Sequence, residues 1–291
     1  MKRVKFPGVV DTITVDDPGL IRTLSEDSRI DRVFKHAPLW NGSFLKRLIR
    51  TLSYRGGRFP HLLPRGYAGR RSRQDELWEL FSKRAAWMAG GPEELEDLSR
   101  WIKGERPLEE PGILVQQVIG LFWSDQYKAT AESWEAAVTL NIAARSRNLL
   151  KMIWWKITGK VSRAKRLLGA MAGNDIVFLH GTAIALHNMV ASVGKMKQMY
   201  ADEALRFSIK AERAVELSLS PPPVVFRQAI SAGEVSGCPF AKFSMFQFKL
   251  SDAYKLTGVK DVIFMSDSWS RCPAERWVPA VLAGIWRRAC K

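Results

Sequence analysis

Three consecutive prolines, Pro221, Pro222 and Pro223, mark a change in the sequence pattern of this chain. Before them, apolar residues recur mostly at helical spacing and glycines or prolines separate the periodic segments. After them, short apolar runs at 224–226 and 243–248 lie on either side of a glycine-containing turn. Because proline continues neither a helix nor a central strand, the prolines separate two kinds of structure. The pattern predicts a mainly α chain with a small β portion near the C-terminus.

The helical segments are best defined where apolar spacing and breakers agree. Pro18 and Pro92 each stand where a helix begins, and the glycines at 90 and 91 stop the segment before Pro92. Helices are expected over 74–89, 133–140, 149–157, 175–200 and 203–219. No linker divides these segments, and 291 residues can form one large core, so a single domain over 1–291 is expected.

Composition limits the class and the compartment. Apolar residues make up 46% of the chain and its mean hydropathy is −0.14, typical of a globular protein. The three cysteines (Cys238, Cys272 and Cys290) have no paired spacing, which argues against a disulfide framework or a cysteine zinc site. The start has no apolar core of a secretory signal, and the apolar runs are too short for a bilayer. A cytoplasmic location follows as the expectation.

Positive charge is concentrated in one segment. The net charge is +16, yet no acidic residue occurs between positions 136 and 174. Such asymmetry indicates an anionic partner: a phospholipid surface, an acidic redox protein or nucleic acid. Trp154 and Trp155, among lysines, suit a membrane interface as well as they suit an ordinary core. Nucleic acid is the weakest of the three partners because none of its common binding motifs occurs.

Cys272 follows a loop of small and polar residues and precedes an apolar run at 277–286. A cysteine at the start of a helix meets backbone N–H groups and the positive end of the helix dipole, and both stabilise a thiolate. Such a thiolate serves as a nucleophile, a redox sensor or an axial ligand of heme iron. A buried, inert thiol is the alternative that the loop by itself leaves open.

Several features follow one another in a set order: a long helix with a polar break at 178–183, then Glu216, the three prolines, Arg227 and the cysteine loop. This order resembles the cytochrome P-450 family of heme-thiolate enzymes. The family's loop reads Phe-Gly-x-Gly-x-His/Arg-x-Cys-x-Gly/Ala. In this chain the glycine positions hold Ser266 and Ser268, the histidine or arginine position holds Ser270, and the last position holds Ala274. The resemblance implies a P-450-like helical fold.

The resemblance also implies heme b as the cofactor. Cys272 is then the iron ligand, and the other cofactor-binding residues are Arg71, Arg73, Arg227 and Ser270. Arginine suits the heme propionates because its planar fork matches a carboxylate. The polar break places His180, Gly181 and Thr182 at the open side of the iron as catalytic residues. The implied function is oxidation or rearrangement of a small apolar substrate by a monooxygenase, peroxygenase or dehydratase-like protein, with an acidic redox partner or an anionic membrane at the basic face.

Histidine at 180 shares a helix face with His187, seven residues later. A histidine near iron moves protons on a bound peroxide or substrate. A core histidine bonded to backbone is the alternative, and it applies to both residues.

Several positions depart from the family pattern. The family's Glu-x-x-Arg pair falls on Glu216 and Leu219, so the arginine is absent, and Met265 stands where the family has phenylalanine. The chain is also short for the family. Two alternatives therefore stay open: a heme-free P-450-like scaffold that acts as a partner-binding helper protein, and a basic peripheral membrane-binding protein.

Overall fold

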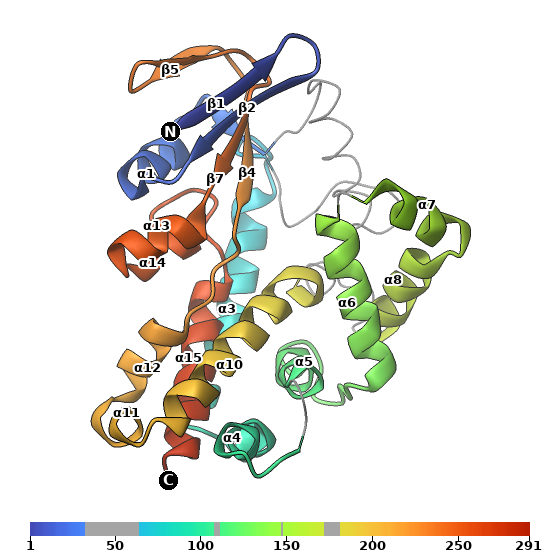
Figure 1. Ribbon diagram of the computed structural model, residues 1–291, viewed down its shortest axis with the longest axis vertical. Helices are drawn as coiled ribbons and strands as arrows, with labels where there is room; N and C mark the ends of the chain where they lie inside the picture. Colours follow the sequence, from blue (N-terminus) through green and yellow to red (C-terminus); the bar gives the residue numbers. More distant parts are fainter. Residues whose placement is uncertain (33–63, 108–110, 147, 172–180) are drawn as a thin grey trace. The chain divides into compact units, whose positions relative to one another are not determined.

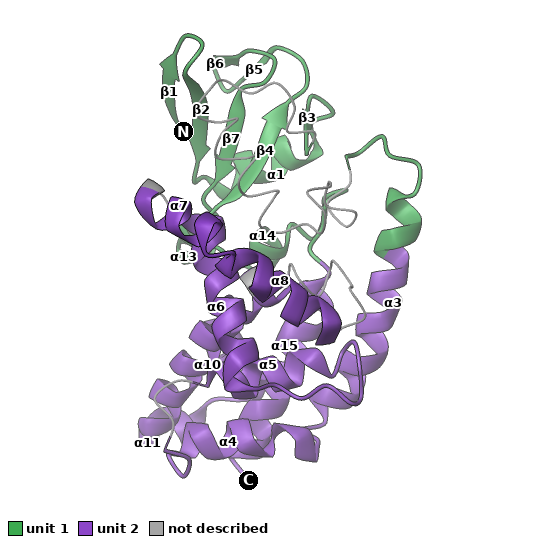
Figure 2. Ribbon diagram, turned by 90° about the vertical axis from the view of Figure 1, so that its right-hand side faces the viewer, with its two compact units in different colours: residues 1–50, 56–74, 221–272 green, residues 51–55, 75–220, 273–291 purple. Residues whose placement is uncertain are grey.

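The computed structural model describes residues 1–32, 64–107, 111–146, 148–171 and 181–291 (Figure 1). Contacts within the chain group into two units, which are coloured in Figure 2. Unit 1 contains Met1–Arg50, Gly56–Gln74 and Pro221–Cys272, and unit 2 contains Thr51–Arg55, Asp75–Ser220 and Pro273–Lys291. Each unit is described by itself below, and the single domain expected over 1–291 stays a prediction.

Unit 1 is built on a five-stranded sheet with the order β1-β2-β7-β4-β3. Its strands are β1 (Lys2–Phe6), β2 (Val10–Val15), β3 (Ile30–Asp31), β4 (Val225–Ala229) and β7 (Met245–Phe248). Strands β2 and β7 pair in parallel, with Thr12 opposite Met245, and the other neighbours pair antiparallel. Strands β5 (Gly233–Val235) and β6 (Cys238–Phe240) form a separate hairpin. The sheet therefore joins the start of the chain to its last quarter.

Three helices of unit 1 accompany this sheet: α1 (Pro18–Glu26), α13 (Leu250–Thr257) and α14 (Lys260–Phe264). The predicted start of α1 at Pro18 is confirmed, and the side chain of Asp17 caps the helix by accepting a hydrogen bond of 2.7 Å from Leu20 N. Helix α1 packs against both α13 and α14. The cysteine loop leaves α14 at Phe264 and so begins within this packed group.

Unit 2 is helical. Helix α3 (Arg70–Ala89) begins in unit 1, to which its residues 70–74 belong, and continues in unit 2, whose last helix is α15 (Ala274–Ala289). The others are the 3-10 turn η2 (Glu93–Leu95), α4 (Glu96–Lys103), α5 (Gly112–Gly120), α6 (Ala131–Arg145), α7 (Leu149–Ile157), α8 (Lys160–Met171), the π-helical turn η3 (Gly181–Ala185), α10 (Leu186–Ala201), α11 (Glu203–Ser208) and α12 (Ala211–Ser218).

Aromatic rings and one close helix contact form the core of unit 2. Phe81 of α3, Phe122 and Trp277 of α15 are buried together, with ring centroids 5.2–6.3 Å apart. Gly284 of α15 lies against the backbone of Met88 at the end of α3, where an added Cβ would stand 2.1 Å from Met88 O. Glycine is therefore required at 284 because the two helices approach each other at this point.

The predicted fold class, mainly α with a small β portion, is confirmed. The single helix expected over 203–219 is wrong, because the chain forms α11 and α12 with extended backbone at Ile209 and Lys210. This break lets α12 turn its buried side chains Ala211, Ala214 and Val215 toward α15. The beginning of the helix expected at 175–200 lies outside the described residues. Among the helices that are described, none is both long and apolar enough to cross a membrane.

Candidate functional site

The loop that carries Cys272 closes back onto the end of α14. Cys272 N donates a hydrogen bond of 2.7 Å to Phe264 O, so both ends of the loop meet. Within the loop, Ser268 N bonds to Met265 O at 3.0 Å and Arg271 N bonds to Ser268 O at 3.1 Å. These turns place Cys272 two residues before the first residue of α15.

Serine at the two family glycine positions fits this backbone. The left-handed residue of the loop is Met265, with φ of 53°, whereas Ser266 and Ser268 do not have positive φ. A side chain at 266 or 268 therefore meets no backbone strain of the kind that requires glycine.

Cys272 is exposed and lies in the electrostatic field of two buried arginines. The interpretation of Cys272 as a buried thiol is therefore wrong. Burial is the largest effect on Arg227 and Arg32 and lowers the pKa of both, and a smaller attraction to the Cys272 sulfur acts in the opposite direction. By the same attraction these two guanidinium groups favour a negative charge on the sulfur.

Arg227 joins the central sheet to the cysteine loop. It belongs to β4, its side chain is buried, and it donates to Ser270 Oγ at 2.9 Å and to Met265 Sδ at 3.4 Å. A third bond, to Phe226 O at 2.7 Å, uses its other terminal nitrogen. Burial lowers the pKa of Arg227 to about 10, so the group stays charged at neutral pH.

Trp269, a residue of the cysteine loop, contacts three further arginines from other parts of unit 1. The guanidinium carbons of Arg32, Arg65 and Arg70 lie 4.7, 5.1 and 5.3 Å from its ring centroid. The Trp269 carbonyl accepts hydrogen bonds from Arg70 at 2.7 Å and from Gln74 at 3.1 Å. Cation–π contacts and these two bonds thus attach the loop to the first turns of α3.

We call Arg32, Arg65, Arg70 and Arg227 the arginine cluster. Asp31 is the carboxylate that accompanies it, through hydrogen bonds from the backbone N of Arg32 and Arg65. Nε of Arg32, Arg65 and Arg227 is buried and has no hydrogen-bond partner among the described residues. Burial and repulsion from Arg227 and Arg70 lower the pKa of Arg32 well below its usual range. The cluster therefore suits an anionic ligand with more than one carboxylate.

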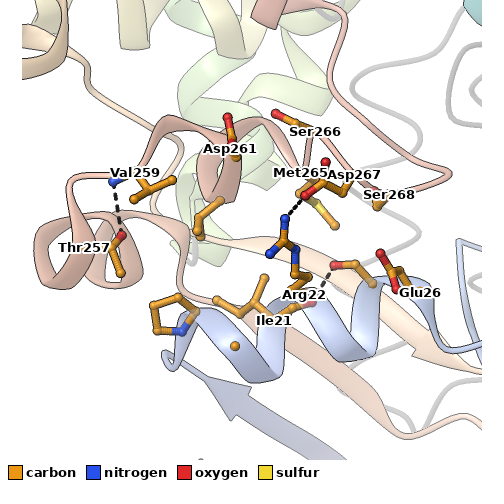
Figure 3. Close-up of a pocket in the computed structure, with 14 residues that line it drawn as sticks. Ile21, Arg22, Glu26, Thr257, Val259, Asp261, Met265, Ser266, Asp267 and Ser268 are labelled. Atoms are coloured by element: carbon orange, nitrogen blue, oxygen red, sulfur yellow. Dashed lines mark hydrogen bonds and ion pairs between the residues drawn. The ribbon is translucent and has the colours of Figure 1, made fainter.

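A second feature of unit 1 is a cavity of about 270 Å³ on the side of the loop that faces α1 (Figure 3). Arg22 of α1 points into it and forms an ion pair with Asp267. Glu26 and Asp261 also line it, so acidic side chains outnumber the single arginine. The arginine that lines this cavity is already paired, so the cavity suits a ligand with two carboxylates less well than the arginine cluster does.

Comparison with solved structures gives the fold. Cytochrome P-450 CYP154C4 of Streptomyces sp. ATCC 11861 superposes with a TM-score of 0.63 at 15% identity, over 99% of this chain and 83% of that one. The chain has the cytochrome P-450 fold. P-450 BioI, solved with an acyl carrier protein ligated to hexadec-9Z-enoic acid, gives 0.59 at 13% identity, over 99% and 85%. P-450 EX alpha, solved with myristic acid, gives 0.59 at 16% identity, over 98% and 82%. No protein-family model and no curated sequence matches the chain.

The five predicted cofactor residues all belong to unit 1, and Ser270 and Cys272 are part of the cysteine loop itself. Arg227, Ser270 and Cys272 lie together in unit 1. Arg71 is exposed and Arg73 is half-buried on α3, whereas their neighbour Arg70 makes the contact with Trp269. Arg71 and Arg73 stay predictions. Sequence reasoning missed Arg32 and Arg65, and in the segment 69–73 it chose Arg71 and Arg73 instead of Arg70; the acid-free, arginine-rich run at 55–73 was a signal for Arg65 as well.

The predicted catalytic residues belong to a different unit. Gly181 opens the π-helical turn η3 and Thr182 in that turn is fully buried, both in unit 2. His180 lies outside the described residues. His187 is half-buried, with Nε2 3.3 Å from Ala137 O and its ring tilted against Trp134 at a centroid distance of 5.1 Å, which fits a core histidine. Burial lowers its pKa to about 4.

The departure at the Glu-x-x-Arg pair has a structural counterpart in unit 2. Leu219 is buried, and its carbonyl accepts a hydrogen bond of 3.2 Å from Lys195. Glu216 instead pairs at 2.8 Å with Arg213, three residues before it, and both side chains are more than half exposed. This exposed pair stabilises the fold weakly at most.

Proposed function

We propose that the protein binds heme b through the thiolate of Cys272 and oxidises or rearranges a small apolar substrate. The observation that carries the proposal is the exposed Cys272 beside a cluster of four arginines accompanied by one carboxylate. This donor set fits heme, which offers an iron for the sulfur and two propionates for the guanidinium groups. The P-450 fold of the chain supports the same assignment.

In this proposal the residues of the loop and sheet have separate tasks. Cys272 holds the iron, and Arg32, Arg65, Arg70 and Arg227 neutralise the propionates. Ser270 holds Arg227 in place through its hydroxyl, and the Met265 sulfur accepts from the same terminal nitrogen of that guanidinium. Bound heme-thiolate supplies oxygen or peroxide activation, because the sulfur donates electron density that favours O–O cleavage.

Substrate and proton handling are assigned to η3. Thr182 is buried in a π-helical turn, a feature frequent at functional sites, and its hydroxyl can pass a proton. The sequence resemblance assigns Gly181 and His180 to the same task. The fatty-acid ligands of P-450 BioI and P-450 EX alpha support an apolar substrate class for this chain as well. An acidic redox partner and a cytoplasmic location remain part of the proposal.

The test is an absorption spectrum of the chain after reconstitution with heme. We expect a red-shifted Soret band in the reduced carbon-monoxide complex, as thiolate ligation gives. Cys272→Ser should remove this band, and Cys290→Ser, a change at another exposed cysteine, should retain it. A band that persists in Cys272→Ser would show that the ligand assignment is wrong.

A heme-free helper protein is the second candidate. Two observations favour it. Leu219 stands where the family has the arginine of its Glu-x-x-Arg pair, and Glu216 forms an exposed ion pair with Arg213 instead, so the ion pair that supports the cysteine loop in the family is missing. Protein that stays colourless after incubation with heme would support it.

A further inference from the structure

Helix α7 exposes an apolar face to solvent. Leu150, Ile153, Trp154 and Ile157 have exposed fractions of 80, 55, 63 and 75%. Their spacing of three, one and three residues places them on one face of the helix. We call these four residues the α7 ridge. An ordinary surface helix shows the opposite pattern, with its apolar side turned inward.

The rest of α7 is anchored. Trp155 is 7% exposed, and Lys151 Nζ lies 4.9 Å from its ring centroid. Asn148 caps the start of the helix through a bond of 2.9 Å from Lys151 N, and Arg163 of α8 donates to Thr158 O at its end. The α7 ridge is thus presented by a capped helix that is anchored through the buried Trp155. Of the adjacent tryptophans, only Trp154 is available for an outside contact.

The charge around the α7 ridge has one sign. Lys151 and Lys156 are exposed on α7, and Arg163 and Arg166 are exposed on α8. No acidic residue occurs in either helix, because the acid-free segment covers 136–174. Glu135 of α6 does reach this region and pairs with Lys160 at 2.9 Å. The exposed cations listed above remain for an anionic partner.

We propose that the α7 ridge inserts into the surface of an anionic lipid bilayer, with the cations of α7 and α8 in contact with the headgroups. Helices that lie in the plane of a membrane–water interface have this composition: aliphatic side chains and tryptophan on the apolar face, with lysines around them. A second copy of this chain is disfavoured as the occupant, because it would bring another net charge of +16. This inference is independent of heme.

Co-sedimentation of the full chain with vesicles tests the proposal. We expect pelleting with phosphatidylcholine vesicles that contain phosphatidylserine, and much less with phosphatidylcholine alone. The double variant Leu150→Glu and Ile157→Glu should lower the partition coefficient at least roughly tenfold, because two aliphatic side chains no longer enter the bilayer. Lys156→Gln should lower it about fivefold.

The matched control is Leu256→Glu, at a leucine of α13 that is 72% exposed and outside the α7 ridge. It should bind vesicles as the unchanged protein does. Because the substituted side chains are exposed, circular dichroism should report an unchanged fold in every variant. Equal pelleting of the double variant and the unchanged protein would overturn the proposal. Self-association that the double variant abolishes would also overturn it, by assigning the α7 ridge to a second copy.

Discussion

Arg227 of β4 donates a hydrogen bond of 2.9 Å to Oγ of Ser270, 43 residues later in the chain. Ser270 Oγ also lies 3.1 Å from Ser268 Oγ, so the arginine is joined to two hydroxyls of the cysteine loop. The family pattern has histidine or arginine at the position of Ser270. The short hydroxyl of Ser270 accepts from a buried arginine of the sheet, whereas the family has a basic side chain of the loop at this position.

Ser270→Ala should therefore destabilise unit 1. The substitution removes the oxygen that accepts the Arg227 bond and leaves a buried charged group with less compensation. We expect the free energy of unfolding to fall by about 1–3 kcal/mol, measured by urea denaturation.

Ser266→Ala is the matched control in the same loop. Ser266 Oγ is buried without a hydrogen-bond partner among the described residues, so its loss should leave the free energy of unfolding unchanged or slightly higher. Equal losses in the two variants would contradict the importance of the Arg227–Ser270 bond.

Arg32→Met should separate stability from cofactor binding. Burial of the Arg32 charge beside Arg227 and Arg70 is unfavourable and is only partly offset by Asp31. Removing that charge should therefore raise the free energy of unfolding of the heme-free protein by about 1–4 kcal/mol. Its affinity for heme, from titration followed at the Soret band, should fall because one propionate partner is gone. Arg22→Met is the control, since Arg22 is 66% exposed and pairs with Asp267 outside the arginine cluster. An Arg32→Met variant that is less stable yet binds heme normally would contradict the role given to the cluster.

Gly284→Ala and Gly194→Ala should change stability in opposite directions. At 284 the new Cβ meets Met88 O at 2.1 Å, which forces α15 away from α3 and should cost about 1–3 kcal/mol or more. Gly194 lies inside α10 with no atom within 4 Å of the added Cβ, so alanine there should stabilise by about 0.5–1 kcal/mol. Urea denaturation midpoints measure both. A stable Gly284→Ala protein would show that the helices do not approach as closely as described.

The sequence predicts local structure well and long-range neighbours poorly. The start of α1 follows from Asp17 and Pro18, and α7 has the bounds that its apolar spacing predicts. The break at Ile209 is different, because it depends on how α12 packs against α15 and leaves no breaker residue in the sequence. Helical period alone therefore extends the helix too far.

The residues of the candidate site also include some that the sequence predicts and some that it does not. Cys272, Ser270 and Arg227 could be found from the order of motifs along the chain. Arg32 and Trp269 could not, because 237 residues of sequence separation fall between two side chains that meet at 4.7 Å. Strand pairing brings them together, since β3 joins the sheet beside β4. A single sequence does not encode that pairing as a local pattern.

His187 should make the protein sensitive to mild acid. Burial, assisted by repulsion from Arg145 and opposed by the bond to Ala137 O, lowers its pKa from 6.5 to about 4. Between these two values the unfolded chain binds a proton that the folded chain does not, so stability present above pH 6.5 is lost as the pH falls toward 4. The loss amounts to about 3 kcal/mol at most. Urea denaturation from pH 7 to 4 should show a smaller loss for His187→Gln than for the unchanged protein, because glutamine does not titrate; parallel curves would assign the acid sensitivity to other groups.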